Sequence, residues 1–456
     1  MTKNLPWWIQ LLPAGIREGL SGREGARRVV ENVGWLMADR VFRLFLVFAV
    51  NVAVARYLGP DQFGLMSYVL AFVSLFAAFS NIGLDPILVR EAVRHPTSQD
   101  QGIVFGTAVV LRVVAGFCGY LAVCALALLL HSADPWLLGL MALAATALLF
   151  QAFEVGDPWF QAKVASRYTV MARGLSVVLA AGIKLGFIAA GLSITYFIAA
   201  HAVEALLGSV LLFFAYRRKA GREHAWIFDR ATARSLAREA APLFFSALAV
   251  AAYMKLDVIL LARLGSPQDV GYYSAAQRIV ELWYFVPIAI SLSVFPALVN
   301  SRLADPDLFF ERLTLLYRFL IFTSVAFALL ITVSAGWLIS VLYGPSYQPA
   351  GDVLRVLAWA SLATSLGVAS SQFLLVEGLT RLALWRTLIG LSVSIAGILI
   401  LAPRFQALGA AVATVVGYSV ATFSIILFPG LQRHSRTMGG AFNPFPLWVA
   451  FFGKRH

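Results

Sequence analysis

Long apolar segments alternate with short polar connections along almost the whole chain. About twenty apolar residues cross the hydrocarbon core of a bilayer as a helix, and twelve segments have that length. They are predicted near residues 34–55, 64–84, 103–130, 136–157, 169–190, 193–215, 240–262, 271–299, 313–342, 353–378, 381–402 and 405–429. The pattern predicts an all-α polytopic membrane protein.

A long polar connection divides these segments into two sets of six. We therefore expect an interfacial N-terminal segment at 1–33, an N-lobe at 34–215, a basic linker at 216–239, a C-lobe at 240–430 and a tail at 431–456. Prolines are expected to bend both lobes, because Pro86 and Pro296 would break the second and eighth spans.

An internal repeat supports the two lobes. Ala55-Arg56, Pro60, Gly64 and Ser67 recur as Ala262-Arg263, Pro267, Gly271 and Ser274 at a shift of 207. Each set joins the first and second spans of its lobe, so both lie on the same side of the membrane. The halves are therefore predicted to be parallel repeats around a central cavity, related by an axis along the membrane normal.

The composition agrees with this class. Hydrophobic residues make up 60% of the chain, charged residues 13%, and the mean hydropathy is +0.81, which excludes a soluble globular protein. The net charge of +13 does not indicate a nucleic-acid partner, because Lys and Arg gather in the connections and suit anionic headgroups. Cys118 and Cys124 lie in one span and point in different directions, so no disulfide is expected.

The basic residues also predict an orientation. Connections on one side carry a series of Lys and Arg, the densest being Arg217, Arg218, Lys219 and Arg222 in the linker. The other side has little beyond Arg56, Arg263 and Arg404. Since positive residues are retained in the cytoplasm, both termini are expected there.

Several charges lie inside the predicted spans, where a charge is costly and faces a partner or a watery cavity. In the first span, Asp39 and Arg43 are four residues apart on one helix face and can pair, while Arg40 can reach the interface. A buried pair that only locks helix packing is the competing interpretation.

Further candidates lie in the third, seventh and eighth spans. Arg112 has no acid in its own helix, and one of Lys255 and Asp257 is expected to face the cavity. Arg278 and Glu281 are three residues apart on one face, so their pairing with each other competes with a role in binding. These five residues, with Asp39, Arg40 and Arg43, are the predicted substrate-binding set.

The run ARYLGPDQFGLMSYVLAFVSLFAAFSNIGLDPILVREA carries a resemblance. Its Leu-Gly-Pro-x-x-Phe-Gly turn (58–64) and its Gly-Leu-x-Pro-x-Leu-x-Arg segment (83–90) resemble polysaccharide-type lipid-linked oligosaccharide flippases. These are members of the multidrug/oligosaccharidyl-lipid/polysaccharide exporter superfamily. The second half departs from the pattern, because LARLGSPQDVGYYS lacks the Phe-Gly pair.

The resemblance implies a function and partners. It implies a bacterial inner-membrane flippase that moves an undecaprenyl-diphosphate-type glycolipid from the cytoplasmic to the periplasmic leaflet by alternating access. A polysaccharide polymerase or export machinery would be a partner besides membrane lipids. Coupling to H⁺ or Na⁺ is left open.

Other functions are less well supported. The chain has no Walker A loop, His-Glu-x-x-His motif or paired-Cys spacing, so no enzyme activity, cofactor or metal is expected. A cation-coupled multidrug exporter should have an acidic or apolar cavity, whereas Arg and Lys here are at least as numerous as acids. A peptidoglycan-precursor flippase should have extra spans, and a membrane glycosyltransferase or polymerase should have a long outer loop.

Overall fold

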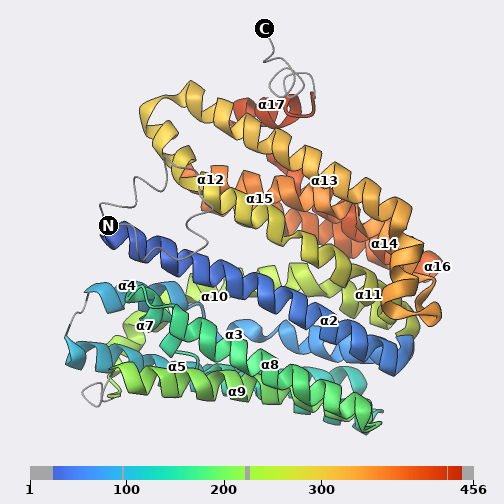
Figure 1. Cartoon of the computed structure of the whole chain (residues 1–456), viewed down its shortest axis with the longest axis horizontal. Coiled ribbons are helices and arrows are strands. Elements are labelled where there is room, and N and C mark those ends of the chain that lie inside the picture. Colours follow the sequence, from blue (N-terminus) through green and yellow to red (C-terminus); the bar gives the residue numbers. More distant parts are fainter. Residues whose placement is uncertain (1–23, 95–96, 221–225, 429, 444–456) are drawn as a thin grey trace, which may run out of the picture. The chain divides into compact units, whose positions relative to one another are not determined.

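The computed structural model describes residues 24–94, 97–220, 226–428 and 430–443. Within these ranges the regular structure is helical (Figure 1). The predicted all-α class is therefore confirmed.

Ten helices in the described ranges are long and apolar enough to cross a membrane. The elements are α2 (Glu24–Ser74), α3 (Ala77–Asn81), α4 (Asp85–Arg94), α5 (Ser98–His131), α6 (Pro135–Gln151), α7 (Gly156–Ala162), α8 (Arg167–Ala189), α9 (Ile194–Ala220), α10 (Arg230–Leu264), α11 (Pro267–Trp283), α12 (Phe285–Ala304), α13 (Pro306–Tyr343), η2 (Pro345–Tyr347), α14 (Ala350–Leu357), α15 (Ala360–Val376), α16 (Thr380–Phe423), η3 (Ser424–Leu427) and α17 (Gln432–Gly440). The chain is a multi-pass membrane protein.

Two of these helices, α2 and α16, contain a residue of non-helical backbone conformation, and each covers two predicted spans. In α2 the break is Gly59, whose φ of 72° is left-handed and free of strain only for glycine. In α16 the break is Gln406, with φ of 51°. The breaks explain why ten helices correspond to twelve predicted spans.

The two proline predictions fare differently. The second span does break beside Pro86, because α3 ends at Asn81 and α4 begins at Asp85. The prediction for Pro296 was wrong, since Pro296 lies inside α12. The eighth span is interrupted only at Tyr284, which keeps helical dihedral angles (φ −59°, ψ −20°), and Pro287 follows in the first turn of α12, where a missing amide hydrogen costs little.

The chain forms two compact units. Unit 1 contains Met1–Ala49, Ala78–Phe187 and Ala199–Phe244, and unit 2 contains Val50–Ala77, Ile188–Ile198 and Phe245–His456. The bend at Gly59 therefore lies in unit 2. The predicted lobe boundaries remain a prediction.

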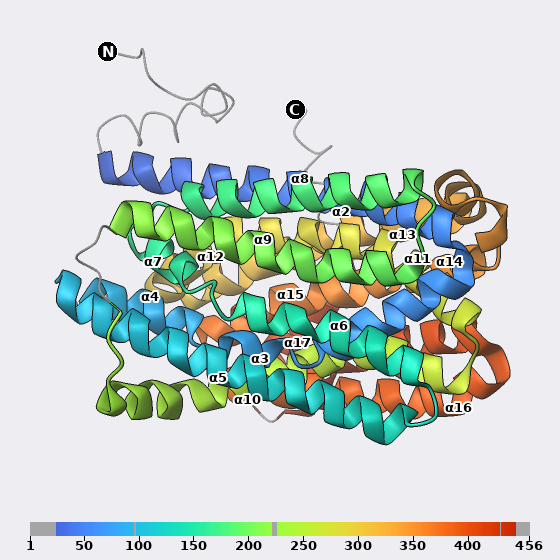
Figure 2. The same ribbon diagram turned by 90° about the horizontal axis from the view of Figure 1, so that it is seen from below.

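In unit 1, α5 packs along α6, and α8 runs beside α9 (Figures 1 and 2). The core gathers buried aromatic and aliphatic side chains, including Leu84, Phe105, Trp159, Phe160 and Tyr216. Their burial fixes the helices around the interior ion pairs described below.

In unit 2, α13 packs against α15 and α12, and α17 packs on α13. Its core includes Phe309, Tyr317, Leu366 and Phe373.

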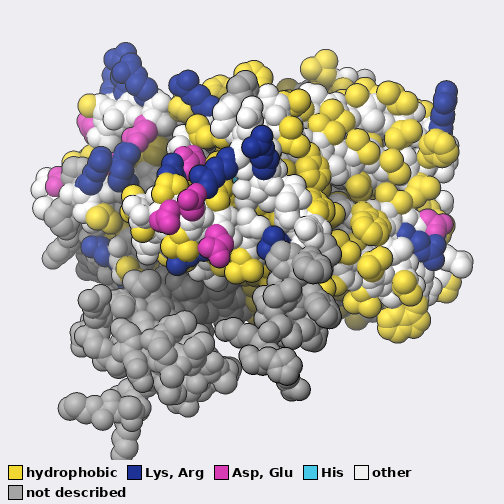
Figure 3. All heavy atoms as spheres, turned by 90° about the horizontal axis from the view of Figure 1, so that it is seen from above, with side chains coloured by type: hydrophobic (Ala, Val, Ile, Leu, Met, Phe, Trp, Pro, Cys, Tyr) yellow, Lys and Arg dark blue, Asp and Glu magenta, His cyan; other side chains and the backbone are white. Residues whose placement is uncertain are grey.

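On the molecular face drawn in Figure 3, apolar side chains cover a broad area, and most charged side chains lie apart from it. Such a surface suits a bilayer.

Candidate functional site

The two copies of the repeat meet inside unit 2 through their glycines. A Cβ atom on Gly64 would lie 2.7 Å from the Gly271 nitrogen and overlap the Pro267 carbonyl oxygen. A Cβ atom on Gly271 would overlap the Pro60 carbonyl oxygen in the same way. The contact is reciprocal, so the repeated Pro and Gly positions allow the two backbones to touch.

A buried carboxylate lies on the seventh predicted span, in α10. The Asp257 side chain accepts hydrogen bonds from the Tyr273 hydroxyl (2.5 Å) and from Gln277 Nε2 (3.3 Å). The Tyr273 oxygen also lies 2.9 Å from Thr414 Oγ1, which ties α10 to α11 and α16. Hydroxyl and amide groups therefore surround Asp257, including the backbone amide of Val258, which donates to Oδ1 at 2.8 Å.

The partner of Glu281 differs from the prediction. Lys255 Nζ lies 3.6 Å from Glu281 Oε1, so this acid pairs across two helices of unit 2. In the described ranges Arg278 and Glu281 form no ion pair, and the predicted pairing along one helix was wrong. Three of the predicted residues, Lys255, Asp257 and Glu281, therefore lie together.

Arg112 has a partner that the sequence did not indicate. Its side chain is 1% exposed and forms an ion pair with Asp85 at the start of α4. The break between α3 and α4 brings this carboxylate to α5. Arg112 lies in unit 1, and its role in substrate binding remains a prediction.

Arg90, the last residue of the Gly-Leu-x-Pro-x-Leu-x-Arg segment, forms hydrogen bonds with two carboxylates. Its Nη2 donates to Glu239 Oε2 at 2.7 Å, and Nε donates to Glu91 at 3.0 Å. These two carboxylates raise the pKa of the Arg90 guanidinium above its ordinary value. Arg90 thus fixes α4 to the start of α10.

The predicted residues of the first span all lie on α2. Arg40 is exposed and Arg43 is half-buried, while the side chain of Asp39 lies outside the described part of the structure. The helix preserves the spacing of four residues between Asp39 and Arg43. Their pairing remains a prediction.

Arg386 is a buried cation that was not among the residues predicted from the sequence. Its side chain is 8% exposed and donates to the Gly367 carbonyl oxygen (3.2 Å) and to Ser371 Oγ (2.8 Å), while its Nη1 has no hydrogen-bond partner. In the described ranges it forms no ion pair with a carboxylate.

Interior ion pairs between distant segments were missed as well. Arg173 pairs with Glu154 (2.6 Å) and Asp157 (3.2 Å), and Lys184 pairs with Glu204 (2.8 Å), all within unit 1.

Among the described residues no three His, Cys, Asp or Glu side chains converge as metal ligands. Cys118 and Cys124 are free thiols, as predicted.

Comparison with known proteins gives the family. Residues 29–301 match the model of the family described as "Polysaccharide biosynthesis protein". The "Probable flippase AglR" of Haloferax volcanii is 34% identical over 196 residues, which cover 41% of this chain and 39% of that protein. The match thus spans about two fifths of the relative's length.

Two solved structures share the fold. An inward closed "Lipid II flippase MurJ" has a TM-score of 0.70 at 15% identity, covering 92% of this chain and 93% of that one. An inward-facing multidrug resistance MATE transporter of the MOP superfamily has a TM-score of 0.66 at 14% identity, covering 87% and 95%. The fold is that of MOP-superfamily transporters, as the resemblance implied, and the chain belongs to the polysaccharide biosynthesis protein family.

Proposed function

We propose that this protein is a flippase for a polyprenyl-diphosphate-linked oligosaccharide, which it moves from the cytoplasmic to the periplasmic leaflet by alternating access. The observation that carries the proposal is the family match over residues 29–301. The partial match to a probable flippase and the fold shared with MOP-superfamily transporters support it.

The charge inside unit 2 favours an anionic substrate. In the described part of this unit Arg278, Arg318 and Arg386 lie within helices of membrane-spanning length and form no ion pair with a carboxylate. Among the described residues of the same helices, further cations without an ion pair are Arg56, Arg312, Arg381 and Arg404, and the acids without one are Asp61, Asp257, Asp269 and Glu311. Cations exceed acids, and a diphosphate can supply the missing negative charge.

The orientation and setting follow from the same proposal. Both termini lie in the cytoplasm of a bacterial inner membrane, and the glycolipid is of the undecaprenyl-diphosphate type. A polysaccharide polymerase or export machinery takes the product. Asp257, buried among hydroxyl groups, is the residue through which H⁺ or Na⁺ would couple to transport.

The test is transport by the purified protein in vesicles that contain a fluorescent polyprenyl-diphosphate sugar. Arg386→Gln and Lys255→Gln should each slow flipping about tenfold or more, because each removes a charged contact. The matched control is Arg381→Gln, which removes an exposed charge from the same helix as Arg386.

The same assay distinguishes a glycolipid flippase from a cation-coupled multidrug exporter. If the wild-type protein moves a cationic dye and leaves the glycolipid in place, it is a drug exporter. If the glycolipid moves and both interior variants match the control, the function stands but these residues are not its binding site.

A further inference from the structure

The two copies of the repeat, residues 55–67 and 262–274, lie against each other inside unit 2. Besides their glycines, Asp61 and Gln268 stand at equivalent positions, and Gln268 Nε2 donates to Asp61 Oδ2 at 2.9 Å. Contacts between equivalent positions are those that a two-fold arrangement of two copies gives. One further contact, made by a residue outside both copies, departs from this symmetry.

That residue is Tyr347, which contacts both copies at once. It ends the short helix η2, between α13 and α14, and its side chain is fully buried. Its hydroxyl donates to the Ala55 carbonyl oxygen of the first copy at 2.8 Å. Its ring centroid lies 6.3 Å from that of Phe63 in the first copy and 6.3 Å from that of Tyr272 in the second.

The break in α2 explains why Ala55 can accept this bond. The backbone leaves the helical conformation at Gly59, so the four carbonyls before it lie at a helix end, where partners outside the helix can satisfy them. Ala55 is the first of these four residues. Tyr347 therefore caps this helix end from a distant part of the chain.

Two other bonds hold the first copy at the same end of unit 2. The Tyr57 hydroxyl donates to the Leu192 carbonyl oxygen at 3.0 Å, and Arg56 Nη1 donates to the Val341 carbonyl oxygen at 3.4 Å. Both bonds are exposed, whereas the bond of Tyr347 is buried. Because a hydrogen bond is stronger where water does not compete, the bond of Tyr347 contributes most to this contact.

We propose that Tyr347 is a positioning residue for transport, whose hydroxyl holds the two copies together while the substrate enters from the opposite side. The copies part, and the bond to Ala55 breaks, when the substrate leaves on this side. This is the predicted outer side, where Arg56 and Arg263 lie. The proposal rests on the proposed function, since it assigns the contact to the exit of a flippase.

The parting of the copies can be measured without any substrate. Ser274 lies three residues after Gly271 on the same helix face, and its hydroxyl is buried without a partner among the described residues. With Cys118→Ser and Cys124→Ser as background, Ser274→Cys should react slowly with a maleimide in the purified full chain. Adding Tyr347→Phe should speed this reaction about three- to tenfold, because only the closed arrangement loses a hydrogen bond.

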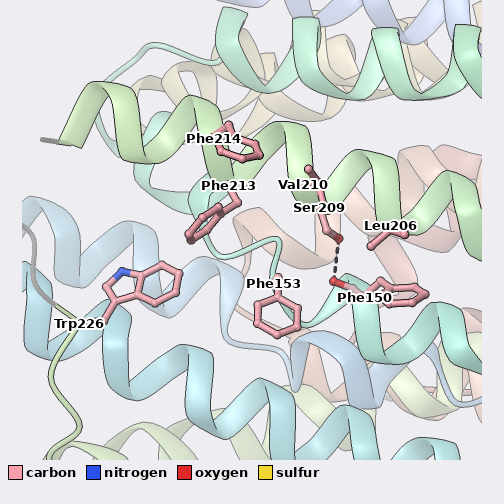
Figure 4. Close-up of a pocket in the computed structure, with 8 residues that line it drawn as sticks. All are labelled: Phe150, Phe153, Leu206, Ser209, Val210, Phe213, Phe214 and Trp226. Atoms are coloured by element: carbon pink, nitrogen blue, oxygen red, sulfur yellow. Dashed lines mark hydrogen bonds between the residues drawn. The ribbon is translucent and has the colours of Figure 1, made fainter. Parts of the chain in front are cut away.

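Tyr343→Phe is the matched control. The Tyr343 ring centroid lies 5.3 Å from that of Tyr347, but its hydroxyl has no hydrogen-bond partner in the described ranges, so its removal should not speed the reaction. Phe214→Leu controls for a general loosening of the helices. Phe214 lines an apolar groove in unit 1 and makes none of these contacts, so this variant should also leave the rate unchanged (Figure 4).

A cross-link tests whether transport requires the copies to part. In the same background, a short bismaleimide with a disulfide in its linker joins Asp61→Cys to Gln268→Cys. The cross-link should slow flipping of the glycolipid in vesicles about tenfold or more, and reduction of the linker should restore it. The control pair is Asp352→Cys with Arg355→Cys, two exposed positions within α14, whose cross-link should leave flipping unchanged.

Two outcomes would overturn the proposal. In the first, the Tyr347 and Tyr343 variants label at the same rate. In the second, the cross-linked protein flips the glycolipid as fast as the reduced protein, a result that also covers the case in which Tyr347→Phe does not fold. If the wild type moves no glycolipid, the proposed function fails instead, whereas faster labelling of the Tyr347 variant alone still supports its bond between the copies.

Discussion

At the scale of single residues, the buried Asp257 depends on its neighbours. A carboxylate in a membrane-spanning unit needs donors, and the Tyr273 hydroxyl supplies one at 2.5 Å. The same oxygen contacts Thr414. One hydroxyl thus joins three helices around the acid.

Replacing Tyr273 with Phe should lower the stability of the protein by about 1–3 kcal/mol, because it leaves a buried carboxylate short of a donor. Thermal unfolding of the purified protein measures the change. The control is Tyr343→Phe, since the Tyr343 hydroxyl is buried without a partner and its removal should be neutral or stabilising. Equal losses in the two variants would show that the network contributes nothing.

His434 on α17 should make the docking of that helix depend on pH. It is 1% exposed, its Nε2 lies 2.8 Å from the Tyr317 hydroxyl, and its ring stacks on Phe373. Burial and the nearby Arg386 lower the pKa of His434 to about 4. The docked helix therefore holds a neutral imidazole across the range in which a free histidine titrates.

The direction in which pH changes the docking of α17 follows from this lowered pKa. When the helix is undocked, His434 is protonated below about pH 6.5. When the helix is docked, His434 is protonated only below about pH 4. Docking should be fully stable above pH 6.5 and lose about 3 kcal/mol as the pH falls to 4. Hydrogen exchange of residues 432–440 measures it, and His434→Gln should remove the dependence.

At the scale of helices and hairpins, Gly64 and Gly271 allow the repeated segments to touch. A Cβ atom at either position would overlap a carbonyl oxygen of the other hairpin. Backbone atoms cannot rotate away as a side chain would. The two hairpins must therefore separate to accept any larger residue.

Gly271→Ala should move the hairpins apart. The distance can be followed by cross-linking Asp61→Cys to Gln268→Cys with a short bismaleimide, because the native side chains meet between the hairpins, with Gln268 Nε2 2.9 Å from Asp61 Oδ2. We expect about tenfold less cross-link, since overpacking costs ~1–3 kcal/mol. Gly182→Ala is the control, because nothing lies within 4 Å of its added Cβ atom. An undiminished cross-link in the Gly271 variant would contradict this account.

The spans could be predicted from the sequence, because apolar length is a local property. The breaks beside Gly59 and Pro86 were also local. Partners such as Asp85 for Arg112 and Glu281 for Lys255 were not, since contacts between separate helices leave no periodic signal. Arg386 was missed because its burial depends on the packing of α16 against α15.

At the scale of the whole molecule, the charge asymmetry predicts which connections face which side. Arg404 lies beside the break in α16, and Arg436 lies on α17. Both side chains are exposed. They follow the predicted eleventh and twelfth spans respectively, so they should lie on opposite sides of the membrane.

Labelling with a membrane-impermeant maleimide tests this arrangement. In a background with Cys118→Ser and Cys124→Ser, intact cells should label the R404C variant strongly and the R436C variant weakly. Permeabilised cells, as the control, should label both. Strong labelling of R436C alone in intact cells would reverse the predicted orientation.

The Gly64–Gly271 contact has a consequence for how such a chain arose. If the two halves descend from one duplicated gene, the ancestor had a single glycine that met its own copy across the symmetry axis of a homodimer. A side chain gained at that position would have clashed twice in the dimer but only once per substitution in the fused chain. After fusion each half could therefore diverge, while Gly64 and Gly271 both remained restricted to glycine by the contact between them.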